Sequence, residues 1–197
     1  MREHISKILF AVMIFLPLLI FLGSMLVGRS TPVENRSVHT ASFLNTSANK
    51  VEVVFFGYVG CAFICPTALN TLGEVIEDVK KENPEASLGA YFVDVNAETQ
   101  VRRAHQYSQF FSDDIVGVNV NKAELDQLKR LFGITVVDTN RDMNEIIHTD
   151  HFFVVKHTTD GWRIARVLSN ESNKDTIKEV VDQVLEGEES NVMLANF

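Results

Sequence analysis

Residues 51–82 pass from an apolar strand through a glycine turn into an amphipathic helix, and this order strongly restricts the fold. Residues 51–56 are apolar except for Glu52, as expected of a strand that is covered on both faces. Pro66 suits the first turn of a helix, because its missing N–H would have no helical partner there. The pattern therefore predicts a strand of a buried sheet followed directly by a helix.

Cys61 and Cys65 are the only cysteines of the chain, and both lie at this strand-to-helix junction. Free N–H groups and the helix dipole stabilise negative charge there, so the pKa of a thiol is lowered. The thiolate is the form that attacks disulfides and binds metal ions. The placement therefore predicts a reactive pair, whereas the alternative is two structural cysteines or one inert disulfide.

A segment of 20 residues without charge, 8–27, follows a short N-terminus that carries Arg2 and Lys7. Its length and composition predict a transmembrane helix, and the absence of a small-residue cleavage site favours an uncleaved anchor over a signal peptide. We expect residues 1–7 in the cytoplasm and the soluble domain in the periplasm or an equivalent extracytoplasmic space. The net charge of -8 argues against nucleic acid as a partner.

The rest of the chain has the length of one ordinary domain. Residues 28–49 are rich in Ser, Thr and Asn and predict a linker, in which Phe43 and Leu44 could dock as a short strand. The domain itself is expected at 50–187, and residues 188–197 are expected to form a flexible tail.

Strands and helices alternate early in the domain, and a hairpin and a helix close it. Helices are expected at 66–82, 99–111, 122–132 and 174–187, and strands at 51–56, 88–95, 115–120, 152–155 and 162–168. A polar loop is expected at 138–144. This order is that of the thioredoxin-like α/β sandwich, in which a central sheet is flanked by helices and the first strand-to-helix junction carries the cysteines.

The spacing of Cys61 and Cys65 allows both sulfurs to face one side of a helical turn, close enough for a disulfide or for one metal ion. Two thiolates leave a soft metal under-coordinated, so a third ligand is expected from elsewhere. His148 is our first choice and His151 the fallback, because they precede the strand that would border the cysteines. Thiolates and imidazole suit Cu(I) or Cu(II), whereas zinc normally takes a fourth ligand.

Five segments carry a resemblance to a known family: VVFFGYVGCAFICPTAL, FVDVNAET, LKRLFGI, IIHTDHFFVV and DGWRI. Over about residues 51–187 the chain resembles the Sco/SenC family of membrane-anchored copper-binding proteins. The resemblance implies copper bound by Cys61, Cys65 and His148. It also implies a role in assembling the CuA centre of cytochrome c oxidase, with the CuA-bearing subunit as partner. The family's usual Pro-Asp between the cysteines is replaced here by Ala62 and Phe63.

Two other functions remain open. A membrane-tethered thiol-disulfide reductase would need both cysteines but no histidine. Enzymes of that type carry a cis-proline opposite the cysteines, and the C-terminal half of this chain has no proline. A redox sensor or a relative that has lost its metal is the third possibility. We therefore favour a metallochaperone over an enzyme.

Overall fold

The structure is a computed structural model, which describes residues 33–97, 103–140 and 145–195. The expected membrane span, 8–27, lies outside the described residues. Within the described ranges, no helix combines the length and the apolar character needed to cross a membrane. The chain divides into two units, and the second, Val33–Phe197, contains both cysteines and all the described helices and strands.

A mixed five-stranded sheet forms the centre of this unit, with the strand order β3-β2-β1-β6-β7. The strands are β1 (Val51–Gly57), β2 (Leu88–Asp94), β3 (Ile115–Asn119), β6 (Phe152–Thr158) and β7 (Gly161–Leu168). The first three are parallel, β6 runs antiparallel to β1, and β7 runs antiparallel to β6. All five expected strands are therefore present, and β1 lies in the middle.

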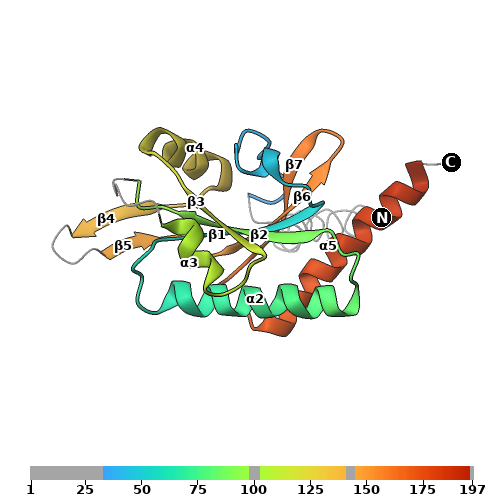
Figure 1. Cartoon of the computed structure of the whole chain (residues 1–197). Coiled ribbons are helices and arrows are strands. Elements are labelled where there is room, and N and C mark those ends of the chain that lie inside the picture. Colours follow the sequence, from blue (N-terminus) through green and yellow to red (C-terminus); the bar gives the residue numbers. More distant parts are fainter. Residues whose placement is uncertain (1–32, 98–102, 141–144, 196–197) are drawn as a thin grey trace, which may run out of the picture. The chain divides into compact units, whose positions relative to one another are not determined.

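Helices cover both faces of the sheet (Figure 1). The helices are α2 (Ile64–Glu82), α3 (Ala104–Gln109), α4 (Lys122–Phe132) and α5 (Lys174–Ala195). The α2 and α5 helices pack on one face, and α4 lies over the other. The α4 helix begins as expected, since Asn121 and Glu124 form a reciprocal capping box.

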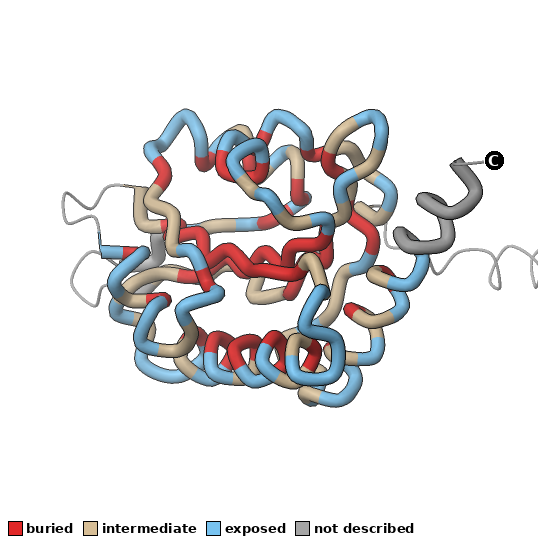
Figure 2. Tube along the Cα trace, turned by 45° about the vertical axis from the view of Figure 1, so that its right-hand side comes forward, coloured by how far each residue is buried: buried red, intermediate tan, exposed pale blue. Residues whose placement is uncertain are grey.

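Every residue of β1 is buried, and alternate residues belong to different cores. Val53 and Phe55 pack with the inner face of α2, whereas Val54 and Phe56 pack with α4. Figure 2 shows the buried residues concentrated in the central strands and along the inner side of α2. This two-sided burial explains why the strand is almost uniformly apolar.

The segment before β1 is not the free linker that its composition predicts for 28–49. Val38 and Leu44 are fully buried, and the Val38 N–H donates to the carbonyl of Trp162 at 2.8 Å. Phe43 and Leu44 do dock, but Leu44 begins a single 3-10 turn, η1 (Leu44–Thr46), rather than a strand. The linker prediction is wrong for residues 33–49 because their few apolar side chains find partners far away in the chain.

A separate two-stranded antiparallel sheet consists of β4 (Val136–Asn140) and β5 (Glu145–His148). The expected loop at 138–144 is therefore shorter. The two strands pair with each other and are not part of the five-stranded sheet. Because they are not covered on both faces, their sequence does not need the apolar run of a buried strand. This hairpin carries His148 at its end, opposite Val136.

Two helix boundaries also differ from expectation. The α3 helix begins at Ala104, whereas the sequence predicts a start at residue 99; residues 98–102 lie outside the described ranges. The α5 helix continues through Gly187 to Ala195, although the tail is predicted to begin at residue 188. One glycine within a helix costs only about 1 kcal/mol relative to alanine, so it need not end the helix.

Candidate metal centre

Cys61 lies in the loop after β1, and Cys65 lies in the first turn of α2. Neither forms a disulfide. The backbone N–H of Cys65 donates to the Cys61 sulfur at 3.4 Å, which fixes one sulfur against the start of the helix. Cys61 is half-buried and Cys65 fully buried, so only the first of the two is open to solvent.

The two thiols differ in acidity. Burial acts to raise the pKa of Cys61, but hydrogen bonds from the backbone and thiol of Cys65 and from the backbone of Phe63 and Ile64 outweigh it, and the pKa is lowered. Burial strongly raises the pKa of Cys65. Of the two thiols, Cys61 therefore ionises more readily than Cys65.

Gly57 fixes the depth of Cys65 below the surface. A Cβ atom at Gly57 would lie 2.7 Å from the Cys65 sulfur and 2.8 Å from Cε2 of Phe92. Real Cβ atoms do not approach other atoms so closely, so the last residue of β1 must lack a side chain. The sulfur and the aromatic ring are therefore packed tightly against the backbone of β1.

An open cleft of about 490 Å³ adjoins the cysteine loop. Both Cys61 and His148 line it, together with Tyr58. Three further lining residues are exposed apolar side chains, namely Phe63 at 82%, Ile147 at 57% and Ile64 at 45%. The cleft therefore has a thiol and an imidazole in its lining and an apolar rim, which is typical of a surface that contacts another molecule.

The imidazole of His148 is oriented by a neighbouring carbonyl. Its Nδ1 lies 3.0 Å from the carbonyl oxygen of Thr149, and a carbonyl only accepts hydrogen bonds. The neutral ring must therefore carry its proton on Nδ1, which leaves the lone pair of Nε2 available to a metal ion. A backbone carbonyl on one ring nitrogen is the usual arrangement for a metal-binding histidine.

Tyr58 lines the same cleft as Cys61 and His148, although no sequence motif singles it out. Its ring meets that of His148 edge to face, with the centroids 5.8 Å apart. Burial, followed by the charge of Cys61, raises the pKa of Tyr58. An aromatic residue directly after the strand-ending Gly57 was the only available signal.

His151, the fallback ligand, is not among the residues that line the cleft. Its Nδ1 lies 3.9 Å from Oδ1 of Asp150, and this nitrogen is buried without a hydrogen-bond partner among the described residues. Of the two histidines, it is therefore His148 that the structure brings to the same cleft as Cys61.

The predicted ligands are near one another but do not form a closed metal site. Among residues 33–97, 103–140 and 145–195, no three His, Cys, Asp or Glu side chains lie close enough to hold a metal ion. The structure pairs Cys61 with Cys65 and places His148 across the cleft from Cys61. Soft thiol and imidazole donors are of the kind that fits copper.

One buried carboxyl lies close to this site. Asp94, at the end of β2, accepts hydrogen bonds from the N–H of Asn96 at 3.0 Å and from the side chain of Asn119 at 3.1 Å. Burial raises the pKa of Asp94 to about 6. Its negative charge adds to burial in raising the pKa of Cys65.

Fold and site together define a thioredoxin-like α/β domain with two free cysteines at its first strand-to-helix junction. The profile of the SCO1/SenC family matches residues 37–186. The chain therefore belongs to the SCO1/SenC family.

Curated relatives match a part of the chain. The human mitochondrial SCO1 homolog is 23% identical over 104 residues, which are 52% of this chain and 35% of the human protein. The mitochondrial SCO1 homolog 1 of Arabidopsis thaliana is 25% identical over 107 residues, 54% of this chain and 31% of that protein. These matches span about a third of the length of each relative.

Solved structures show the same fold. Copper-bound ScoI of Arabidopsis thaliana superimposes with a TM-score of 0.63 and 19% identity, over 74% of this chain and 89% of that chain. Copper-bound yeast Sco1 superimposes with a TM-score of 0.59 and 18% identity, over 74% of this chain and 79% of that chain. Apo Sco1 from Thermus thermophilus superimposes with a TM-score of 0.58 and 25% identity, over 73% of this chain and 82% of that chain. The expected thioredoxin-like sandwich is confirmed.

Proposed function

We propose that this chain binds copper through Cys61, Cys65 and His148 and delivers it to, or matures, the CuA-bearing subunit of cytochrome c oxidase. The observation that carries the proposal is the single cleft lined by both Cys61 and His148. Membership of the SCO1/SenC family supports it. So do two relatives solved with copper bound and a third described as a member of a family of cytochrome c oxidase assembly proteins.

The three donors would have different parts in binding. Cys61, partly exposed and with a lowered pKa, would meet the ion first. Cys65 would follow with loss of its proton, so that binding releases protons to solvent. His148 would close the site through Nε2. Soft thiolates favour Cu(I), and the added imidazole also suits Cu(II).

We further propose that residues 8–27 anchor the chain in a membrane, with residues 1–7 in the cytoplasm and the folded domain outside it. The uncharged segment of 20 residues supports this arrangement. A reporter enzyme fused after Phe197 is expected to be active only outside the cytoplasm. Cytoplasmic activity of the fusion would overturn this topology.

Copper titration of the purified chain under reducing conditions tests the main proposal. We expect one Cu(I) per chain, held against a competing chelator, and no such binding after Cys61→Ser with Cys65→Ser. A parent protein that loses all copper to the chelator would contradict the proposal.

A thiol-disulfide reductase is the second candidate, and the unequal acidity of the two thiols favours it. A partly exposed thiol of lowered pKa beside a buried partner is an arrangement that suits dithiol exchange. Reduction of a model peptide disulfide by a parent protein that does not bind copper would establish this function instead.

A further inference from the structure

The strand β5 borders the cleft that Cys61 lines. Within the described ranges it pairs only with β4, so its other edge has no strand beside it. Three of its four residues, Ile146, Ile147 and His148, line the cleft. A short strand with one unpaired edge therefore lies beside the more accessible thiol.

The outer edge of β5 is directed toward the loop that carries Cys61. In an antiparallel pair, successive residues turn their N–H and C=O groups alternately toward the partner strand and away from it. The N–H of Thr149 donates to a carbonyl on the β4 side at 2.9 Å, so Ile146 and His148 turn their backbone groups away from β4. The backbone of Ile146 accordingly hydrogen-bonds to the side chain of Tyr58 in that loop. The same edge therefore offers the N–H and C=O of His148 to a further strand.

The lining of this cleft is apolar and carries little charge. Phe63, Ile64 and Ile147 lie exposed around it. Among the described residues, the lining contains one acidic side chain, Asp150, and neither lysine nor arginine. The Asp150 carboxylate accepts a hydrogen bond from Asn170 at 2.6 Å. With a net charge of -8 on the whole chain, the cleft favours an apolar occupant without acidic residues.

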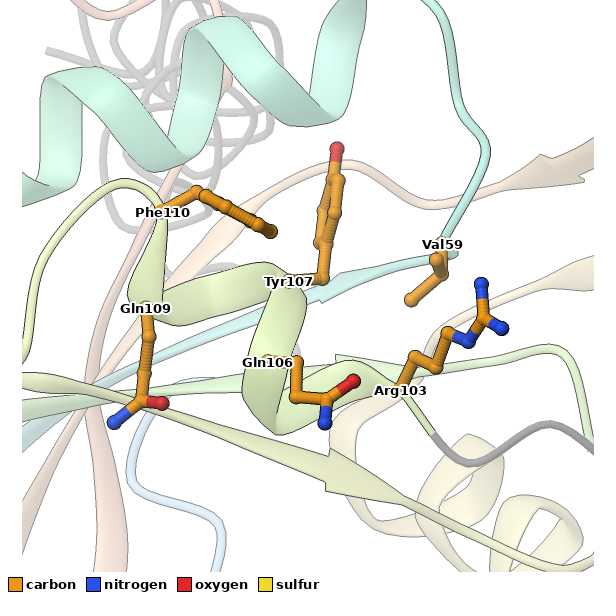
Figure 3. Close-up of a pocket in the computed structure, with 6 residues that line it drawn as sticks. All are labelled: Val59, Arg103, Gln106, Tyr107, Gln109 and Phe110. Carbon is orange, nitrogen blue, oxygen red and sulfur yellow. The ribbon is translucent and has the colours of Figure 1, made fainter.

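The other side of the same loop has a different lining. Figure 3 shows Val59 at a second cavity, of about 650 Å³, with its side chain on the same side as Arg103 and Tyr107. The described residues that line this cavity include no cysteine and no histidine. A partner that exchanges a metal ion or a disulfide with Cys61 therefore finds the thiol and an imidazole together on the side of β5.

We propose that the outer edge of β5 binds an extended segment of the partner protein, which adds a third strand to the β4–β5 sheet and brings a cysteine next to Cys61. The segment is apolar and free of acidic residues. Main-chain hydrogen bonds to β5 hold it, and alternate side chains contact the apolar lining. A cysteine is required because a thiol can accept copper from Cys61 or exchange a disulfide with it. That the partner is the CuA-bearing subunit rests on the proposed function, whereas the docking itself requires no copper.

Peptides with an activated cysteine test this inference on the reduced full-length chain. The probe is Lys-Thr-Val-Cys-Val-Thr-Lys with blocked ends, its cysteine held as a thiopyridyl disulfide. Attack by the Cys61 thiolate joins the peptide to Cys61 and releases pyridinethione, whose absorption gives the rate. The control peptide has the same sequence with N-methyl groups on the adjacent Thr and Val before the cysteine, so that one hydrogen bond to β5 is lost in either register. We expect the unmodified peptide to react about ten-fold faster. Each rate is divided by that of the same peptide with glutathione.

Ile147→Ser and Val137→Ser are the matched protein variants. The two residues face each other across the β4–β5 sheet and are exposed to 57% and 46%, but Ile147 lines the cleft and Val137 does not. Each peptide rate is taken relative to that of dithiodipyridine with the same protein, which reports the intrinsic reactivity of Cys61. We expect this ratio to fall about ten-fold in Ile147→Ser, because an apolar contact with the peptide is lost. Val137→Ser should keep the ratio of the parent.

Three results would overturn the inference. One is an equal rate for the two peptides, which would show that no strand forms along β5. Another is an Ile147→Ser protein with the parental ratio. The third is a dimer of the parent that Ile147→Ser separates into monomers in ultracentrifugation, since a second copy of the chain would then occupy the edge. A parent that prefers the unmodified peptide but binds no copper would retain the docking edge and overturn only the proposed function.

Discussion

The backbone N–H of Cys65 is directed at the sulfur of Cys61 across 3.4 Å, so the second cysteine of the motif stabilises negative charge on the first. This hydrogen bond and those from neighbouring residues lower the pKa of Cys61 although burial acts against them. Burial of Cys65 raises its pKa and outweighs a hydrogen bond from the backbone of Tyr58. The cysteine pair is therefore built from one reactive thiol and one protected thiol.

Alkylation should distinguish the two cysteines. We expect iodoacetamide to modify Cys61 at least about ten-fold faster than Cys65, because the thiolate is the reactive form and only Cys61 is accessible. The midpoint of the Cys61 rate against pH should lie below its ordinary pKa of 9.0. Peptide mapping by mass spectrometry gives both rates in one experiment. Equal rates would contradict the asymmetry.

His148→Ala should weaken copper binding by about 10- to 100-fold or more, because it removes one of three proposed ligands. The reduction potential of the cysteine pair should change little, since exchange depends on thiol acidity and access. A chelator competition measures the first quantity and glutathione equilibration the second.

His151→Ala is the control for this experiment, because His151 does not line the cleft with Cys61. It should bind copper like the parent. Loss of copper in His151→Ala alone would mean that the other histidine of the segment is the ligand. Parental affinity in both variants would remove histidine from the site.

Glu52→Gln should stabilise the protein at neutral pH. The carboxyl of Glu52 is only 2% exposed, and its Oε2 has no hydrogen-bond partner among the described residues. Burial raises its pKa, although Ser47, Asn49 and Lys80 act in the opposite direction. The substituted amide keeps the oxygen that Ser47 and Asn49 contact and removes the buried charge.

The sign of the pH dependence follows from the raised pKa. Between the ordinary value of 4.5 and the higher folded value, the folded state binds more protons than the unfolded state. Stability due to Glu52 is therefore lost as the pH rises through this window. Urea unfolding at several pH values should show Glu52→Gln more stable by on the order of 1 kcal/mol at pH 7, with no difference below pH 4.5. If Glu52→Gln were less stable than the parent at pH 7, the interactions of the ionised Glu52 carboxylate would outweigh the cost of burying its charge.

Gly57→Ala should destabilise the fold by about 1–3 kcal/mol, because the new methyl group would overlap the Cys65 sulfur and the Phe92 ring. Its thermal midpoint should fall, and Cys65 should become more reactive toward alkylating agents.

Gly187→Ala is the opposite case, since nothing lies within 4 Å of its added methyl group in α5. That variant should be more stable by up to about 1 kcal/mol. A Gly57→Ala protein with the same thermal midpoint as the parent would contradict the crowding at Gly57.

Much of the fold could be predicted because local pattern and tertiary structure agree. The uniformly apolar β1 lies at the centre of the sheet, and the capping residues Asn121 and Glu124 begin α4 as their spacing indicates. Both cysteines lie at the predicted junction.

The remaining features depend on contacts between distant residues, which no local pattern reveals. Val38 is buried because it pairs with β7, more than one hundred positions away. The β4–β5 hairpin pairs with itself outside the main sheet, so Val137 and Ile147 stay exposed and the segment resembles a loop. Tyr58 gains its significance only because the fold places it in the same cleft as Cys61 and His148.

The central position of β1 also determines when the cysteines become protected during synthesis. β1 pairs on one side with β2, but its other partner is β6, where Phe55 faces Phe152. Cys61 leaves the ribosome 91 residues before Phe152, which is roughly 5 to 20 seconds at ordinary rates of elongation. Throughout that interval, the sheet next to both thiols still lacks β6. Any oxidant or metal ion that reaches the nascent chain in this interval therefore meets the two thiols before the folded site exists.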